Sequence, residues 1–76
     1  MFPMAHIRSA KAYGEALRAR RRHLGLTQED VAIEAGVGRR FVIELERGKP
    51  GASLEHALRV AALLGLEIDL APRERG

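Results

Sequence analysis

Arginine and lysine are the side chains of this sequence whose types and spacing could do chemistry. The chain has 13 of them against 10 acids, a formal net charge of only +3, but the excess is concentrated in two groups. The first surrounds a single acid, Glu15, and comprises Arg8, Lys11, Arg18, Arg20, Arg21 and Arg22. The second is interleaved with Glu44 and Glu46 and comprises Arg39, Arg40, Arg47 and Lys49. A local basic face favours a polyanion partner, although arginine-rich helix surfaces are often simply solvated.

The sequence has few residues that could form disulfides, metal sites or catalytic groups. The chain has no cysteine, which removes disulfides, thiolate metal sites and cysteine nucleophiles, and which suits a reducing compartment. His6, His23 and His56 have no metal-ligand spacing and belong to no visible nucleophile or acid–base arrangement. We therefore expect no cofactor, no metal site and no enzymatic activity.

The length of the chain indicates a single domain with a single function. With 76 residues there is room for one domain and one modest core, so stability must come from packing and from a partner subunit. No signal-peptide pattern and no run of roughly 20 apolar residues is present. The expectation is a soluble cytoplasmic protein.

Capping and helix-breaking residues divide the chain into short helical segments. Ser9 can cap a first helix that runs to about His23. Thr27 and Asp30 resemble a capping box, which opens a second helix through about Ala35. This second helix is only about two turns long.

Two more helices follow a break at Gly36. One begins near Arg39 and ends at Gly48, and the next is capped by Ser53 and stopped by Gly65. The expected apolar stripe of the last helix consists of Leu54, Ala57, Leu58, Ala61 and Leu64. Four helices of this length predict a compact all-α core.

The segment after Gly65 changes period. Leu66, Ile68 and Leu70 alternate with acids, which is typical of a β-strand. A lone strand has no partner within one chain, so we expect it to pair with the same strand of a second copy about a twofold axis. The alternative is an irregular segment folded onto its own core.

The stretch from residue 26 to residue 53 holds the decisive pattern. Ala32 sits where two short helices must approach closely, Gly36 supplies the turn between them, and Val37 fills the corner. Val42 and Leu45 return to the core. This spacing predicts two helices joined at a steep angle, with the second one exposed.

On these residues the chain resembles the lambda-repressor-like (Cro/C1-type, XRE) helix-turn-helix family of phage and bacterial regulators, over roughly residues 9–66. The matching residues are Thr27, Gln28, Ala32, Gly36, Val37, Val42, Leu45, Glu46, Gly48 and Lys49. The layout is most similar to HipB-type antitoxins, through GEALRARRRHLGLTQ, RRFVIELERGK and the alternating tail. The resemblance implies an N-terminal arm at 1–8, a DNA-binding domain at 9–65, a dimerisation strand at 66–71 and a flexible tail at 72–76.

The resemblance also implies that the helix from Arg39 lies in the major groove of DNA and that Arg39, Arg40 and Glu44 occupy base-reading positions. Arginine can donate two hydrogen bonds to guanine, so we expect half-sites that contain G, unless these arginines contact phosphate instead. Glu44 could accept a hydrogen bond from cytosine, but an ion pair with Arg40 four residues earlier is the favoured role. Ile43 could touch a thymine methyl or be a merely exposed aliphatic.

Further roles follow from the same resemblance. Gln28 matches a family residue that binds a backbone phosphate, and Arg47 and Lys49 are phosphate candidates whose alternative role is solubility. Arg21 and Glu46 match a partly buried ion pair that joins the first and third helices. The other arginines of the first helix are expected to form an ordinary solvated face: Arg18, Arg20 and Arg22.

The function expected from these features is repression by occupancy. A homodimer would place two recognition helices in successive major grooves of a pseudo-palindromic operator in double-stranded DNA. The likeness to HipB-type antitoxins further implies autoregulation and a HipA-like kinase toxin as partner. The alternatives are a solitary phage-like or restriction-controller regulator and a protein-interaction adaptor that keeps the fold without the DNA contacts.

Overall fold

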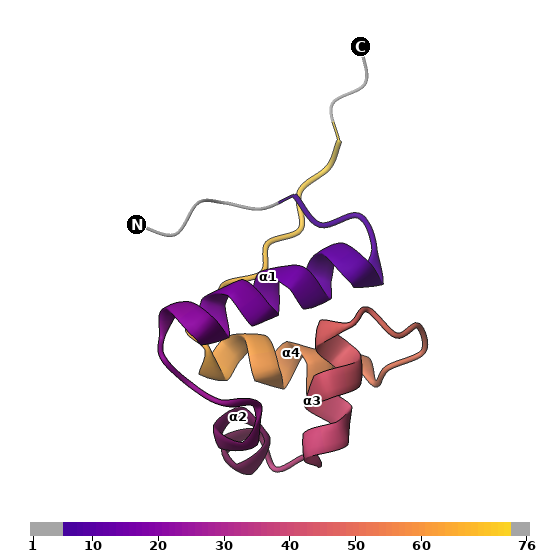
Figure 1. Cartoon of the computed structure of the whole chain (residues 1–76). Helices are drawn as coiled ribbons and strands as arrows, with labels where there is room; N and C mark the ends of the chain where they lie inside the picture. Colours follow the sequence, from indigo (N-terminus) through magenta and orange to yellow (C-terminus); the bar gives the residue numbers. More distant parts are fainter. Residues whose placement is uncertain (1–5, 74–76) are drawn as a thin grey trace.

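Four helices make up the regular structure of residues 6–73, the part of the chain that the computed structural model describes (Figure 1). They are α1 (Ala10–His23), α2 (Gln28–Ala35), α3 (Arg39–Glu46) and α4 (Leu54–Leu63). The all-α prediction is confirmed. Parts of the expected arm and tail, residues 1–5 and 74–76, lie outside the described residues.

The helices begin where the capping residues predict. The Ser9 and Ser53 hydroxyls accept backbone hydrogen bonds at the starts of α1 and α4, at 3.0 and 3.3 Å. At the start of α2 both halves of the capping box are present, since Asp30 N–H donates to the Thr27 hydroxyl and Thr27 N–H donates to the Asp30 carboxylate. Each cap satisfies an amide that the helix leaves unpaired.

One apolar core lies where the four helices meet. Its buried side chains are Leu17, Val31, Ala32, Ala35, Val42, Leu45, Ala57, Val60, Ala61 and Leu64. Polar contacts fasten α1 to the α4 region, because the Tyr13 hydroxyl donates to Ala57 O at 2.6 Å and Arg20 Nε donates to Leu64 O at 2.8 Å. Arg20 therefore holds helices together and does not belong to a merely solvated face.

The predicted stripe of α4 is partly wrong. Leu54 and Leu58 are 71% and 43% exposed, whereas Val60, which the stripe omits, is buried. The face that meets the rest of the molecule consists of Ala57, Val60, Ala61 and Leu64, and it is rotated away from the two leucines. Both faces are apolar, so the sequence period alone did not distinguish them.

The predicted strand at 66–71 is not supported by the structure. No strand forms within residues 6–73, and the chain from Leu66 onward runs without regular structure away from the helical body (Figure 1). Leu66 N–H donates to Ala61 O at 3.0 Å, which closes the end of α4, and its side chain packs against the core. Ile68 and Leu70 are exposed. A strand needs a hydrogen-bonded neighbour, and the described part of this chain supplies none.

Two features fix the position of α3. Gly36 adopts φ +69°, a left-handed conformation that suits glycine, and Val37 N–H then donates to Ala32 O at 3.0 Å, which sets the turn between α2 and α3. Gly14 of α1 lies so close to the end of α3 that an added Cβ would be 2.6 Å from Glu46 O. Gly48, just after α3, approaches Lys11 equally closely.

Candidate DNA interface

The third helix has one buried and one open face. Val42, Leu45 and Glu46 are buried against the rest of the molecule, whereas Arg39 and Arg40 at its start are exposed. The helix is therefore held by its apolar side and presents its arginines to solvent. An outward-facing helix of this kind can enter a groove of a partner molecule.

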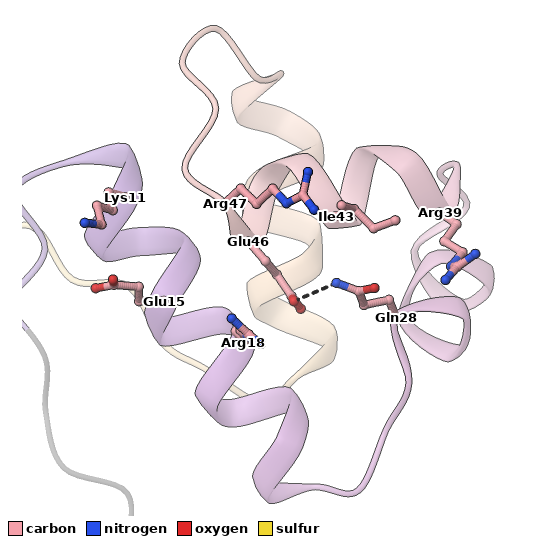
Figure 2. A pocket seen from close by; sticks show the side chains of 8 residues that line it. All are labelled: Lys11, Glu15, Arg18, Gln28, Arg39, Ile43, Glu46 and Arg47. Carbon is pink, nitrogen blue, oxygen red and sulfur yellow. Dashed lines mark hydrogen bonds between the residues drawn. The ribbon is translucent and has the colours of Figure 1, made fainter.

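A shallow groove of about 530 Å³ runs between α1 and α3 (Figure 2). Its lining includes four cations, Lys11, Arg18, Arg39 and Arg47. The acids in the lining are Glu15 and Glu46, and Gln28 and Ile43 complete it. Because Glu46 is already paired with Arg21, the groove carries a net positive charge and suits an anionic partner.

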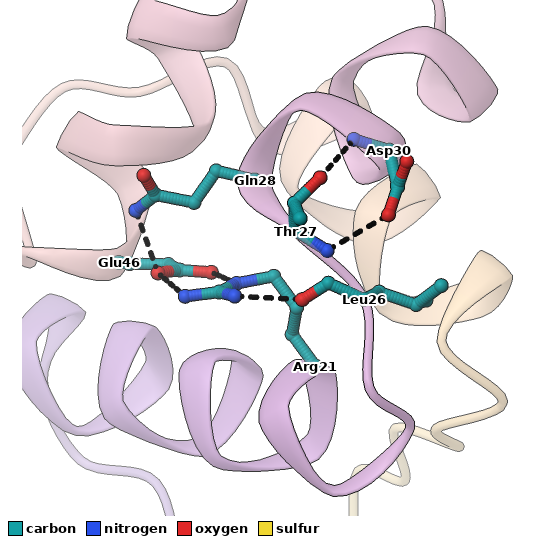
Figure 3. A network of polar contacts seen from close by, with 6 residues as sticks. All are labelled: Arg21, Leu26, Thr27, Gln28, Asp30 and Glu46. Carbon is teal, nitrogen blue, oxygen red and sulfur yellow. Dashed lines mark hydrogen bonds and ion pairs between the residues drawn. The ribbon is translucent and has the colours of Figure 1, made fainter.

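A buried ion pair holds the base of this groove together (Figure 3). Arg21 Nε donates to Glu46 Oε2 at 2.6 Å and Arg21 Nη2 donates to Oε1 at 3.0 Å, a two-pronged contact between residues only 8% and 7% exposed. Arg21 Nη1 also donates to Leu26 O at 2.8 Å. The hydrogen bond to Glu46 raises the pKa of Arg21, which outweighs the lowering effect of burial. The pair joins α1 to α3.

Gln28 extends the same network from the start of α2. Its Nε2 donates to Glu46 Oε1 at 3.0 Å, so three elements meet at one carboxylate. A side-chain amide nitrogen carries two hydrogens, and this bond uses one of them. Gln28 also lines the groove, so the rest of its side-chain amide lies beside the open space.

A second cluster of charges lies on the exposed side of α3. Glu44 accepts from Arg40 Nε and from Lys49 Nζ, both at 3.3 Å. These two cations lower the pKa of Glu44, so the carboxylate stays ionised. The Arg40 side chain is 89% exposed even within this ion pair.

The comparison with protein families matches a helix-turn-helix family model to residues 17–70. That range holds α2, α3 and the turn between them, together with the exposed arginines described above. The chain belongs to the helix-turn-helix family. Its type is the lambda-repressor-like, or XRE, type that the sequence resembles.

Curated relatives carry the same description. The chain is 43% identical over 70 residues to an uncharacterized HTH-type transcriptional regulator, y4mF, of Sinorhizobium fredii, which covers 91% of this chain and 92% of the relative. It is 47% identical over 51 residues to an uncharacterized HTH-type transcriptional regulator of Methanothermobacter thermautotrophicus, which covers 67% of this chain and 74% of the relative. These relatives are described as regulators and not as enzymes.

Solved structures share the helix-turn-helix fold at low sequence identity. One described as a HipB-O4 20mer complex has a TM-score of 0.84 at 20% identity and covers 93% of this chain and 100% of its own. Another, described as a HipA-HipB-O2-O3 complex, matches with the same TM-score, identity and coverage. At this identity the likeness shows the fold.

The residues predicted for DNA contact fall into two places on this helix-turn-helix domain. Gln28, Arg39 and Arg47 come together in the groove between α1 and α3. Arg40, Glu44 and Lys49 form the separate ion cluster. The structure also brings Arg21 and Glu46 together, as the resemblance implies.

Among the groove residues, Lys11, Arg18 and Ile43 have no firm role from the sequence alone, and Glu15 has none at all. The sequence predicts a solvated face for Arg18 and either a base contact or an exposed aliphatic for Ile43, and it indicates no individual role for Lys11. They line the same groove although they come from two helices, α1 and α3, that are distant in the chain (Figure 2). The spacing of Lys11, Glu15 and Arg18 does put them on one face of α1, and that was the available signal.

Residues 6–73 offer no metal site and no membrane-spanning helix. No group of three or more histidines or acids in this range is placed to hold a metal ion. None of the described helices has the length and apolarity required to cross a membrane.

Proposed function

We propose that this protein is a sequence-specific transcriptional repressor that binds a pseudo-palindromic DNA operator as a homodimer in the cytoplasm. In this proposal α3 enters the major groove, and Arg39, Arg40 and Glu44 form its base-reading set. Gln28, Arg47 and Lys49 contact the phosphates on either side. Occupancy of the operator blocks transcription.

The observation that supports the proposal is the combination of an outward-facing α3 with a cationic groove beside it. The exposed arginines at the start of α3 can reach guanine O6 and N7, while Arg18 and Arg47 lie along the groove where a phosphate backbone would pass. A protein-interaction adaptor has no need for this arrangement of charge. The groove therefore favours DNA over a protein partner.

The proposal includes a homodimer because one recognition helix can contact too few base pairs to define an operator. An α3 of 8 residues extends about 12 Å, at about 1.5 Å per residue. That length spans only about four base pairs, at roughly 3.4 Å each. Two copies related by a twofold axis double the sequence that is read.

The experiment is to select bound duplexes from random-sequence DNA with the purified full chain. We expect an enriched pseudo-palindrome with G in each half-site and half-site centres about 10 base pairs apart. Fluorescence anisotropy then compares the selected duplex with a random one. No enrichment and no saturable binding would contradict the proposal and favour the adaptor.

We also propose that the protein is the antitoxin of a HipBA-like toxin–antitoxin system and represses its own operon. Support comes from the fold likeness to HipB structures, one of which contains HipA. The curated relatives are described only as transcriptional regulators, a description that fits an antitoxin and a solitary regulator alike. An antitoxin has a kinase-like partner protein, whereas a solitary regulator has none.

The test is to co-express the chain with the product of any adjacent HipA-like kinase gene. We expect the two proteins to co-purify as a complex and the complex to bind the selected duplex more tightly than the chain alone. If no such gene adjoins this one, or if its product does not bind the purified chain, the solitary-regulator alternative holds.

A further inference from the structure

Ile43 is an apolar side chain in a groove otherwise lined by charged and amide groups. It is half-buried and lies on α3 between Arg47 and Arg39, in the lining of the groove (Figure 2). The partly buried apolar residues that pack against the core are Tyr13, Leu26, Val37, Phe41, Leu63 and Leu66, and Ile43 is not one of them. Core packing therefore does not account for an isoleucine here.

The residues on either side of Ile43 in α3 indicate which group of a bound DNA it would contact. Arg39 lies one turn before it and Arg47 one turn after it, and all three line the groove. The two arginines can donate hydrogen bonds to base edges or phosphates, but an aliphatic group between them can make no hydrogen bond. In the major groove, the apolar group that a base edge presents is the C5 methyl of thymine.

We infer that Ile43 is a specificity residue that reads a thymine methyl beside the base pairs contacted by Arg39. This inference rests on the proposed function, since it requires α3 to lie in the major groove. It adds a contact that selects thymine through apolar burial, alongside the guanine contacts of the arginines. Each half-site then contains a T as well as a G.

The helix geometry gives the register. Four residues of α-helix rise about 6 Å, which corresponds to about two base-pair steps of roughly 3.4 Å. The thymine is therefore expected within about two base pairs of the guanine read by Arg39.

The first test repeats the random-duplex selection with the Ile43→Ala variant. We expect the wild-type site to show a T in each half-site and the variant to lose that preference while it keeps the G. The matched control is Ile33→Ala, which removes the same atoms from α2 at a residue that is 70% exposed and outside the groove. Circular dichroism melts check that both variants fold.

The second test changes only the DNA. Each thymine of the selected duplex is replaced in turn by deoxyuridine, which removes the methyl and leaves the hydrogen-bonding edge intact. We expect wild-type affinity to fall about fourfold at one position per half-site, the effect of burying one methyl group. Ile43→Ala should show no loss at that position, and Ile33→Ala should behave as wild type.

The outcomes separate this inference from the proposed function. If no duplex is selected, the repressor proposal itself is wrong. If a duplex is selected and bound but no deoxyuridine weakens binding, Ile43 does not read thymine. An equal deoxyuridine effect in wild type and Ile43→Ala likewise overturns the inference, because some other residue then contacts the methyl.

Discussion

At the scale of single residues, Arg21 and Glu46 place a full positive and a full negative charge where water hardly reaches. Removing one partner leaves the other charge buried and uncompensated. We expect Arg21→Met or Glu46→Gln to lower the free energy of unfolding by about 3 to 5 kcal/mol, measured by urea denaturation. The two replacements combined should cost less than their sum.

The control for this prediction is Glu55→Gln, which breaks the exposed i,i+4 pair between Glu55 and Arg59. Exposed pairs of this kind contribute about 1 kcal/mol or less. If Arg21→Met lowers the free energy of unfolding no more than Glu55→Gln does, burial adds nothing to the Arg21–Glu46 contact.

Asp30 gives a prediction for pH. Its hydrogen bonds with Thr27 hold the pKa of Asp30 below its ordinary value. A pKa lowered by folding means that the carboxylate stabilises the protein above its unfolded pKa, and that this stabilisation is lost as pH falls through the folded pKa. We expect Asp30→Asn to be less stable than wild type at pH 7 and to lose less stability between about pH 5 and pH 2.

Denaturation curves across this pH range measure the difference. Glu44 contributes with the same sign, since its pKa is also lowered, so Glu44→Gln is measured in parallel to subtract its part. Identical pH dependence of wild type and Asp30→Asn would mean that the capping box does not favour the ionised form.

Arg39 and Arg40 are predicted to carry sequence preference. One good two-bond contact to guanine is worth about 1 to 3 kcal/mol of discrimination. We therefore expect Arg39→Ala and Arg40→Ala to weaken binding to the selected duplex much more than binding to random DNA, measured by competition titration. An equal loss on both duplexes would identify these arginines as phosphate contacts.

At the scale of helices, much of the structure could be predicted because helix ends are set locally. Ser9, Thr27 with Asp30, and Ser53 cap the helices that follow them, and Gly36 makes the turn. The orientation of α4 and the path of the chain after Gly65 depend on what they pack against. That is why Leu54 and Leu58 were predicted to be buried, and why a strand was predicted at 66–71.

The candidate site was predictable to a similar extent. The two arginines at the start of α3 could be identified because they match base-reading positions of the family that the sequence resembles. Lys11 and Arg18 could not, because their role depends on how α1 crosses α3 in space.

Gly14 gives a prediction about that crossing. An added Cβ would meet the Leu45 and Glu46 carbonyl oxygens, so Gly14→Ala must push α1 and α3 apart. We expect a loss of about 1 to 3 kcal/mol in the free energy of unfolding, and weaker DNA binding in the fraction that remains folded. Thermal and urea denaturation measure the first effect, and anisotropy the second.

The matched control is Gly38→Ala at the start of α3. Gly38 has φ −75°, which alanine tolerates, and nothing lies within 4 Å of an added Cβ. Its stability should change by less than about 1 kcal/mol. Equal losses at Gly14 and Gly38 would show that the close contact between α1 and α3 is not what Gly14 provides.

At the scale of the whole molecule, the cationic groove predicts a steep dependence of DNA binding on salt. The logarithm of affinity should fall linearly with the logarithm of salt concentration, with a slope of about 0.9 per phosphate contacted. We expect Arg18→Ala to reduce this slope by about 0.9 on the selected duplex and on random DNA alike, measured by anisotropy between about 50 and 200 mM salt.

Arg59→Ala is the control, because it removes the same charge from α4, where Arg59 bonds Glu55 and Ala35 O. Its slope should match that of wild type. A slope unchanged by Arg18→Ala would place Arg18 outside the DNA interface.

The glycines at 14 and 48 make main chain touch main chain between α1 and the end of α3. No side chain separates the two helices at this contact, so no change of rotamer can adjust the angle between them. We therefore expect this angle to stay fixed when the protein binds a duplex whose shape does not match it. The adjustment must then be made by the DNA, at a cost that depends on how easily each base step bends or twists. Operator choice should accordingly extend to central base pairs that no side chain reaches, where flexible sequences are favoured over stiff ones.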